Sequence, residues 1–66
     1  MSFGTELQKA RIDKGWKQKQ LREALGLDKR QMSLLEHDKR DPRLGLVRHI
    51  AEVLGVPIAQ LVREEE

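Results

Sequence analysis

Cysteine is absent from the 66 residues, which excludes a disulfide framework and a thiolate metal site. No stretch approaches the roughly 20 consecutive apolar residues that a membrane-spanning helix needs. The first stretch, MSFGTELQKA, lacks the basic region and apolar core of a secretory signal. The two histidines, His37 and His49, have no partners at the spacing of metal ligands. We therefore expect a soluble cytoplasmic protein that holds no metal and no cofactor.

Aromatic residues are nearly missing as well, with one Trp, one Phe and no Tyr. Charged residues make up 36% of the chain, which favours a highly solvated surface. The length allows one small domain, residues 1–66, with a modest core. There is no serine–histidine–acid set, no glycine-rich phosphate loop and no carboxylate pair with a pocket, so we do not expect an enzyme.

The charges are unevenly distributed along the chain. Residues 1–43 hold 11 Lys and Arg against 7 Asp and Glu, whereas residues 44–66 hold 2 against 4. A basic first part indicates a surface that meets an anion. The alternative is a mixed solvated surface whose asymmetry has no function.

Helical periodicity and glycine stops divide the chain into short helices. We expect these helices at residues 5–14, 18–25, 29–36, 44–54 and, for a short fifth one, from 57 onward. Gly15, Gly26 and Gly55 end three of them, because glycine adopts the left-handed conformation that closes a helix. No segment alternates like a strand. The predicted fold class is all-α, a compact five-helix bundle, with residues 63–66 as a frayed tail.

The sequence also predicts how three of these helices begin. Thr5 with Gln8, and Asp28 with Gln31, have the spacing of capping boxes, in which side-chain oxygens accept hydrogen bonds from orphan amides. Lys17 stands at the corresponding place before the second helix and has no oxygen in its side chain. We expect a weaker start there.

One apolar face of each of the first four helices is expected to supply the core. These faces hold Leu7, Ala10, Trp16, Leu21, Ala24, Leu25, Met32, Leu35, Leu44, Val47, Ile50, Ala51 and Leu54. An alternative for Trp16 is stacking on a nucleic-acid base, but its place at a turn between helices favours the core. Lys29, Arg30, Ser33 and Leu34 are left on the outer face of the third helix, where an exposed leucine beside two cations is unusual.

Residues 18–36 form two short helices joined by a tight turn at Gly26, which is typical of a helix-turn-helix. In that arrangement the first residues of the second helix reach base edges in the major groove of DNA. Lys29 and Arg30 occupy these positions, and arginine can donate two parallel hydrogen bonds to O6 and N7 of guanine. The alternative is a pair of solvated cations, which the positive end of the helix dipole disfavours.

These residues resemble the helix-turn-helix of phage repressor and Cro proteins and their bacterial relatives, the XRE type. The resemblance lies in positions spread in order over nearly the whole chain: Gly15-Trp16, Gln18, Leu21, Leu25-Gly26, Met32-Ser33, Glu36, Lys39-Arg40, Pro42 and Leu54-Gly55-Val56-Pro57. It implies a lambda repressor-like fold with the motif at about residues 17–36.

The resemblance also implies roles for individual residues. Base reading is expected from Lys29, Arg30, Leu34 and Gln18. Contact with DNA phosphates is expected from Lys17, Gln18, Ser33, Lys39, Arg40 and Arg43. Arg11 and Glu36 match a partly buried ion pair between the first and third helices. The alternative of simple exposure stays open for Gln18 and for the charged loop 37–43.

Three residues depart from the pattern of that family. Lys17 replaces a Ser or Thr cap, Arg22 replaces an alanine that packs on the third helix, and Asp38 replaces the glycine after the third helix. We expect a rearranged packing or an outward stem at Arg22, and a strained or differently shaped turn at Asp38.

The function implied is a homodimeric transcriptional regulator that binds a two-fold symmetric site in double-stranded DNA. Val56, Pro57 and Val62 are the expected self-complementary contact; the alternative is that they only close the monomer core. A phage repressor or Cro, a restriction–modification controller and an antitoxin-type autoregulator all fit. The rival function is a protein-interaction module of the same fold that binds little or no specific DNA.

Overall fold

Helices hold 69% of residues 2–62, which are the residues that this computed structural model describes, and no strand occurs among them. In chain order they are α1 (Phe3–Asp13), α2 (Gln18–Leu25), α3 (Lys29–Glu36), α4 (Leu44–Leu54) and α5 (Ile58–Leu61). The predicted all-α class with five helices is confirmed. The frayed tail predicted for residues 63–66 lies outside the described residues.

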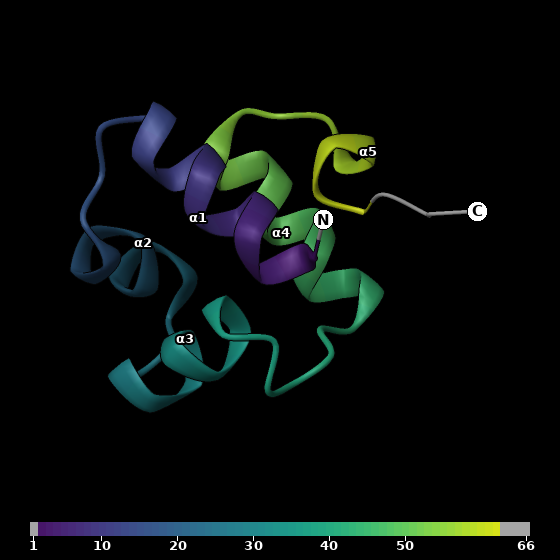
Figure 1. Ribbon diagram of the computed structural model, residues 1–66. Helices are drawn as coiled ribbons and strands as arrows, with labels where there is room; N and C mark the ends of the chain where they lie inside the picture. Colours follow the sequence, from purple (N-terminus) through teal and green to yellow (C-terminus); the bar gives the residue numbers. More distant parts are fainter. Residues whose placement is uncertain (1, 63–66) are drawn as a thin grey trace.

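The helix-turn-helix pair occupies one end of the molecule. In Figure 1, α2 and α3 lie below and to the left of α1 and α4, and α5 lies at the opposite side. Helix α1 packs on both α3 and α5, while α4 packs on both α2 and α5. Each member of the pair is therefore held from behind by a different long helix.

All five helices contribute to a single core. The fully buried large side chains are Leu7, Leu21, Met32, Leu35, Ile50 and Leu61. Trp16 packs half-buried against this cluster, as expected for a core residue at a turn. Lys14 places its Nζ 4.9 Å from the centre of the Trp16 ring, a cation–π arrangement.

The glycine stops were placed correctly. Gly26 and Gly55 cap α2 and α4 with φ of 73° and 69°, in the left-handed region. The bounds of α2 and α4 match those predicted. Because a left-handed residue closes a helix through local backbone geometry alone, the sequence was sufficient here.

The start of α1 was predicted wrongly. The cap is Ser2, whose Oγ accepts a hydrogen bond from the Thr5 amide at 3.2 Å, so Thr5 lies inside the helix. Gln8 does not close a capping box; its Nε2 donates to the carbonyl oxygen of Glu36 at 2.8 Å. The two additional residues at the start bring Phe3 against the core, which a local cap pattern does not reveal.

Two predicted core residues are exposed. Ala24 lies on the solvent side of α2, because the face that α3 and α4 cover is narrow and is filled by Leu21 and Leu25. Leu44 is 59% exposed because it is the first residue of α4 and lies at the edge of the packed region.

Gly4 marks the closest approach of α1 to α3, and the sequence did not single it out. A Cβ at this position would lie 2.5 Å from the carbonyl oxygen of Glu36 and 2.9 Å from that of Leu35. Only a residue without a side chain allows the first turn of α1 to meet the end of α3 at this distance.

Candidate nucleic-acid interface

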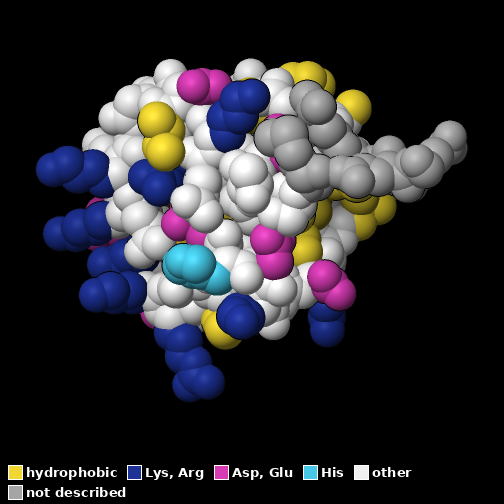
Figure 2. Space-filling view, in the orientation of Figure 1, with side chains coloured by type: hydrophobic (Ala, Val, Ile, Leu, Met, Phe, Trp, Pro, Cys, Tyr) yellow, Lys and Arg dark blue, Asp and Glu magenta, His cyan; other side chains and the backbone are white. Residues whose placement is uncertain are grey.

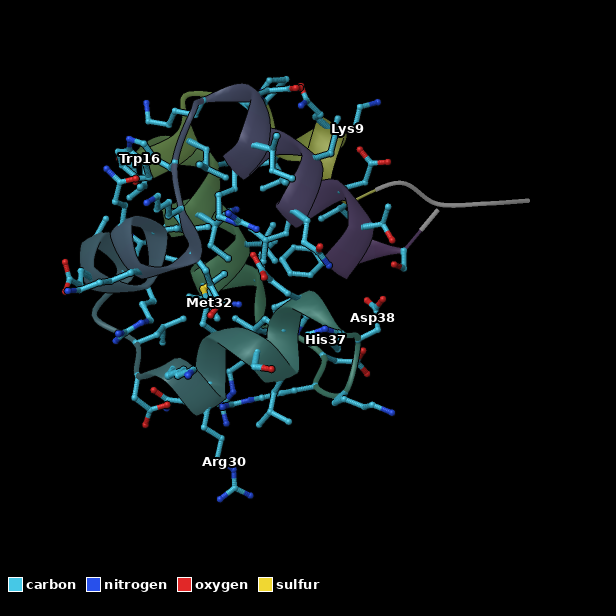
Figure 3. All side chains as sticks on the ribbon, turned by 60° about the vertical axis from the view of Figure 1, so that its left-hand side comes forward. Lys9, Trp16, Arg30, Met32, His37 and Asp38 are labelled. Carbon is cyan, nitrogen blue, oxygen red and sulfur yellow. The ribbon has the colours of Figure 1, made fainter. Side chains whose placement is uncertain are left out.

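The start of α3 presents two free cations to solvent. Lys29 and Arg30 are exposed, and neither forms an ion pair or side-chain hydrogen bond with another residue in the range 2–62. Met32 and Leu35 are buried on the opposite side of the helix, which fixes its rotation about its own axis. Figure 3 shows Arg30 extending away from the body of the molecule.

A capping box holds the first turn of α3, as predicted. Asp28 Oδ1 accepts a hydrogen bond from the Gln31 amide at 2.7 Å, and Gln31 Oε1 accepts one from the Asp28 amide at 3.1 Å. The two side chains therefore satisfy orphan amides next to Lys29 and Arg30. These cations start from a rigid backbone, which reduces the entropy lost when they bind.

The next turn of α3 is less open than expected. Ser33 and Leu34 are both half-buried. The carbonyl oxygen of Ser33 accepts a hydrogen bond from His37 Nδ1 at 2.9 Å, and Ser33 Oγ lies 3.3 Å from the same nitrogen. Because this nitrogen is the donor in both contacts, the hydroxyl hydrogen of Ser33 stays free to donate to a phosphate.

Gln18 and Glu36 join α2 to α3. Gln18 is half-buried and its Nε2 donates to Glu36 Oε1 at 2.8 Å, so one of its two amide hydrogens is already used inside the protein. The other remains for a ligand. Lys17, one residue earlier, is exposed, and its backbone amide donates to Gln20 Oε1 at 2.8 Å.

Arg11 and Glu36 form an ion pair beneath the motif. Arg11 Nε lies 2.8 Å from Glu36 Oε2, and the two side chains are 14% and 4% exposed. The Arg11 guanidinium also donates from Nη1 to the carbonyl oxygen of Trp16 at 2.9 Å. Together with the Gln18 contact, this network links α1, α2 and α3 beneath the motif.

Three further cations lie on the loop between α3 and α4. Lys39, Arg40 and Arg43 are exposed. Arg40 and Arg43 border a hollow at the start of α4, and Arg43 is a cap residue without a side-chain hydrogen bond. The amides of the first turn of α4 carry partial positive charge, so this corner favours an anion.

The turn that leads into this loop has the left-handed conformation, and Asp38 adopts it where the family pattern has glycine. Asp38 has a φ of 58°, the one positive φ among the described non-glycine residues. Its Oδ1 accepts a hydrogen bond from the Gly4 amide at 2.8 Å. The Ser2 side chain, and to a smaller extent this bond from the Gly4 amide, hold the pKa of Asp38 below its ordinary value. Figure 3 shows Asp38 beside the start of α1.

The cations gather on one side of the molecule. In Figure 2 most of the Lys and Arg side chains project from the left and lower edges, over α2 and α3. The α4–α5 side contains instead a largely apolar groove lined by Ala51, Gly55, Val56, Pro57 and Ile58, together with one cation, Arg48, and one anion, Glu52. A basic surface and an apolar surface are therefore separated in space.

The structure does not place the three expected interface residues together. Val56 and Pro57 share the α4–α5 groove, but Val62 lines a different hollow with Phe3 and Leu61. Val56 is also half-buried and packs against the core, so part of its apolar surface closes the monomer.

The part of the chain that the structure describes contains neither a metal-binding cluster nor a membrane-spanning helix. Among residues 2–62, no cluster of three or more His, Cys, Asp or Glu side chains could hold a metal ion. No helix within the same range is long and apolar enough to cross a membrane.

A two-helix motif with free cations at the start of its second helix, on an all-α bundle, defines a DNA-binding helix-turn-helix protein. A family model described as helix-turn-helix matches residues 7–61. The chain belongs to this family, the XRE-type, Cro-like group of DNA-binding regulators. No curated protein matches it, and no solved structure does.

Proposed function

We propose that the protein is a sequence-specific transcriptional regulator that binds a two-fold symmetric operator as a homodimer. The observation that carries this proposal is the pair Lys29 and Arg30, exposed and free of partners among residues 2–62, on a helix start held by a capping box. The positive end of a helix disfavours cations without internal partners. The negative charge of the DNA phosphate backbone offsets that cost, and the neutral O6 and N7 acceptors of guanine accept the hydrogen bonds.

Base reading is assigned to the outer side of the motif. Arg30 would donate two hydrogen bonds to a guanine, and Lys29 a single one to a neighbouring base. Leu34 would pack on a thymine methyl group with the part of its side chain that stays exposed. Gln18 would use its second amide hydrogen, since the first is held by Glu36.

Phosphate contacts are assigned to the residues that flank the motif. Lys17 lies before α2, and Lys39, Arg40 and Arg43 lie beyond the end of α3. Ser33 would join them by donating its hydroxyl hydrogen, which the contacts with His37 leave free. These contacts would fix the position of the domain on DNA without reading sequence.

The homodimer is assigned to the α4–α5 side. Pro57 and Ile58 leave apolar surface uncovered there, and Val62, which lines a different hollow, is a third exposed apolar residue of this part of the chain. A self-complementary contact between two copies would cover this surface and point both copies of α3 to the same side of the DNA.

Selection of binding sites from a library of random duplexes tests the proposal. We expect enrichment of an inverted repeat whose half-sites lie about one helical turn apart, ~34 Å between centres. Enrichment of a single half-site would reject the homodimer but leave sequence-specific DNA binding in place. Absence of any enrichment, with uniform weak binding in a gel shift, would reject sequence-specific regulation and favour the protein-interaction module.

A further inference from the structure

The α3–α4 loop is attached to the rest of the molecule at its first turn. The Lys39 amide donates to the carbonyl oxygen of Leu34 at 2.9 Å, and the Asp38 amide donates to that of Leu35 at 3.3 Å. With Asp38 left-handed, this is the pattern by which glycine usually closes a helix. The next residues along the chain are Lys39 and Arg40, so the turn sets the direction in which they leave α3.

An aspartate at this place has two disadvantages for a DNA-binding loop. Residues other than glycine, asparagine and aspartate rarely adopt a left-handed φ. Aspartate itself adopts it less readily than glycine does. Its negative charge also lies next to the loop cations and repels phosphate. A glycine would avoid both, so the residue needs a compensating contact.

That contact is the bond to α1. Asp38 Oδ1 lies 2.8 Å from the Gly4 nitrogen, across 34 positions of sequence. The Gly4 backbone cannot move away easily, because it is packed against the carbonyl oxygens of Leu35 and Glu36. Gln8 adds a hydrogen bond from α1 to the Glu36 carbonyl. The end of α3 and the start of the loop are thus clamped onto the first turn of α1.

We propose that Asp38 is a positioning residue for DNA binding: its bond to the Gly4 amide holds the loop so that Lys39 and Arg40 face the phosphate backbone. The proposal rests on the phosphate role assigned above to these two residues. It predicts that the aspartate strengthens binding through its oxygen while weakening it through its charge. The two effects have opposite signs, which makes them separable.

Asp38→Asn and Asp38→Gly are the matched pair for this test. Both remove the charge, and both residue types accept a left-handed φ. Only asparagine keeps an oxygen that can accept from the Gly4 amide. We expect Asp38→Gly to bind every duplex, operator and random alike, about three- to tenfold more weakly than Asp38→Asn, a factor typical of one lost hydrogen bond.

Two further measurements support the test: the first checks the bond itself, and the second separates positioning from mere stability. Hydrogen exchange at the Gly4 amide should be faster in Asp38→Gly than in Asp38→Asn, because only asparagine keeps the acceptor. Affinities are measured well below the melting temperature of each variant, so that a difference in global stability does not change the folded fraction. In an Arg40→Ala background, the difference between the two variants should shrink, because one of the side chains being positioned is gone.

The outcomes distinguish this inference from the function on which it rests. If Lys39→Ala and Arg40→Ala leave DNA affinity unchanged, the phosphate role itself is wrong. If they weaken binding while Asp38→Gly and Asp38→Asn bind equally, the phosphate role stands and the positioning role of Asp38 is rejected. A loss confined to the operator would also reject it, because that would place the effect on base reading by α3.

Discussion

Arg30 and Arg40 carry the same charge but are assigned different tasks, and single substitutions separate them. Arg30→Ala should cost ~1–3 kcal/mol on the preferred operator and relax the preference at one base position of each half-site. Arg40→Ala should weaken all duplexes about equally and lower the salt slope by about 2 in a dimer, since two phosphate contacts are lost. Fluorescence titrations over a range of salt concentrations measure both quantities. Equal losses for Arg30→Ala on operator and random DNA would leave base reading to Lys29, Gln18 and Leu34.

The carboxylate of Asp38 also makes the stability of the fold sensitive to acid. Hydrogen bonds from Ser2 and Gly4, with a smaller contribution from the charge of His37, hold its pKa below the ordinary value of 3.8. A carboxyl group with a lower pKa in the folded state stabilises the fold above its unfolded pKa, and the stabilisation is lost as the pH falls through the folded pKa. We expect the melting temperature of the wild type to fall towards that of Asp38→Asn as the pH is lowered below about 4. Parallel curves for the two proteins would contradict this linkage.

At the scale of elements, the contact between α1 and α3 depends on the missing side chain of Gly4. Gly4→Ala should destabilise the protein by ~1–3 kcal/mol, because the new methyl group meets backbone that must shift. Gly45→Ala is the matched control, since no atom lies within 4 Å of a Cβ at that position in α4. Alanine favours a helix there and should be neutral or stabilising by up to ~1 kcal/mol. Thermal unfolding of the two variants checks the difference, and equal effects would show that the close approach is unimportant.

The network of Arg11, Gln18 and Glu36 joins three helices and should dominate the stability of the motif. Arg11→Ala leaves the Glu36 carboxylate buried with only the Gln18 amide as a side-chain partner, a loss of ~3–5 kcal/mol. With a total of roughly 5 kcal/mol for a small domain, the variant should be largely unfolded. The double variant Arg11→Met, Glu36→Leu strands no charge and should regain much of the loss. A melting temperature for Arg11→Ala within a few degrees of wild type would show that the pair has no structural role.

At the scale of the whole molecule, the α4–α5 groove provides a direct test of the proposed homodimer. Ile58 lines this groove and is partly exposed, so Ile58→Asp should disrupt a dimer with little damage to the core. Ile12, 61% exposed on α1, lines none of the three hollows described, and Ile12→Asp is the control. Sedimentation at micromolar concentration should show twice the mass of the 7.7 kDa chain for the wild type and the control. A 7.7 kDa species alone, with and without DNA, would reject the dimer.

Properties that depend on neighbours along the chain could be predicted from the sequence. The ends of α2 and α4 at Gly26 and Gly55 follow from the left-handed freedom of glycine, and the Asp28–Gln31 box follows from a spacing of three. The helix-turn-helix motif could be recognised from the same local signals, because its helices, turn and cations lie close together in sequence. The lambda repressor-like fold was implied by the family resemblance, whose positions are spread over nearly the whole chain.

Only the tertiary structure decided what depends on segments that are distant in sequence. The cap of α1 moved to Ser2, and Ala24 and Leu44 became exposed, because the packing of one helix on another selects which part of an apolar face is covered. The role of Gly4 depends on the end of α3, where it meets the carbonyl oxygens of Leu35 and Glu36 and donates to Asp38. A contact across 34 positions depends on how α1 and α3 are placed in space, and no periodicity in the chain encodes that placement.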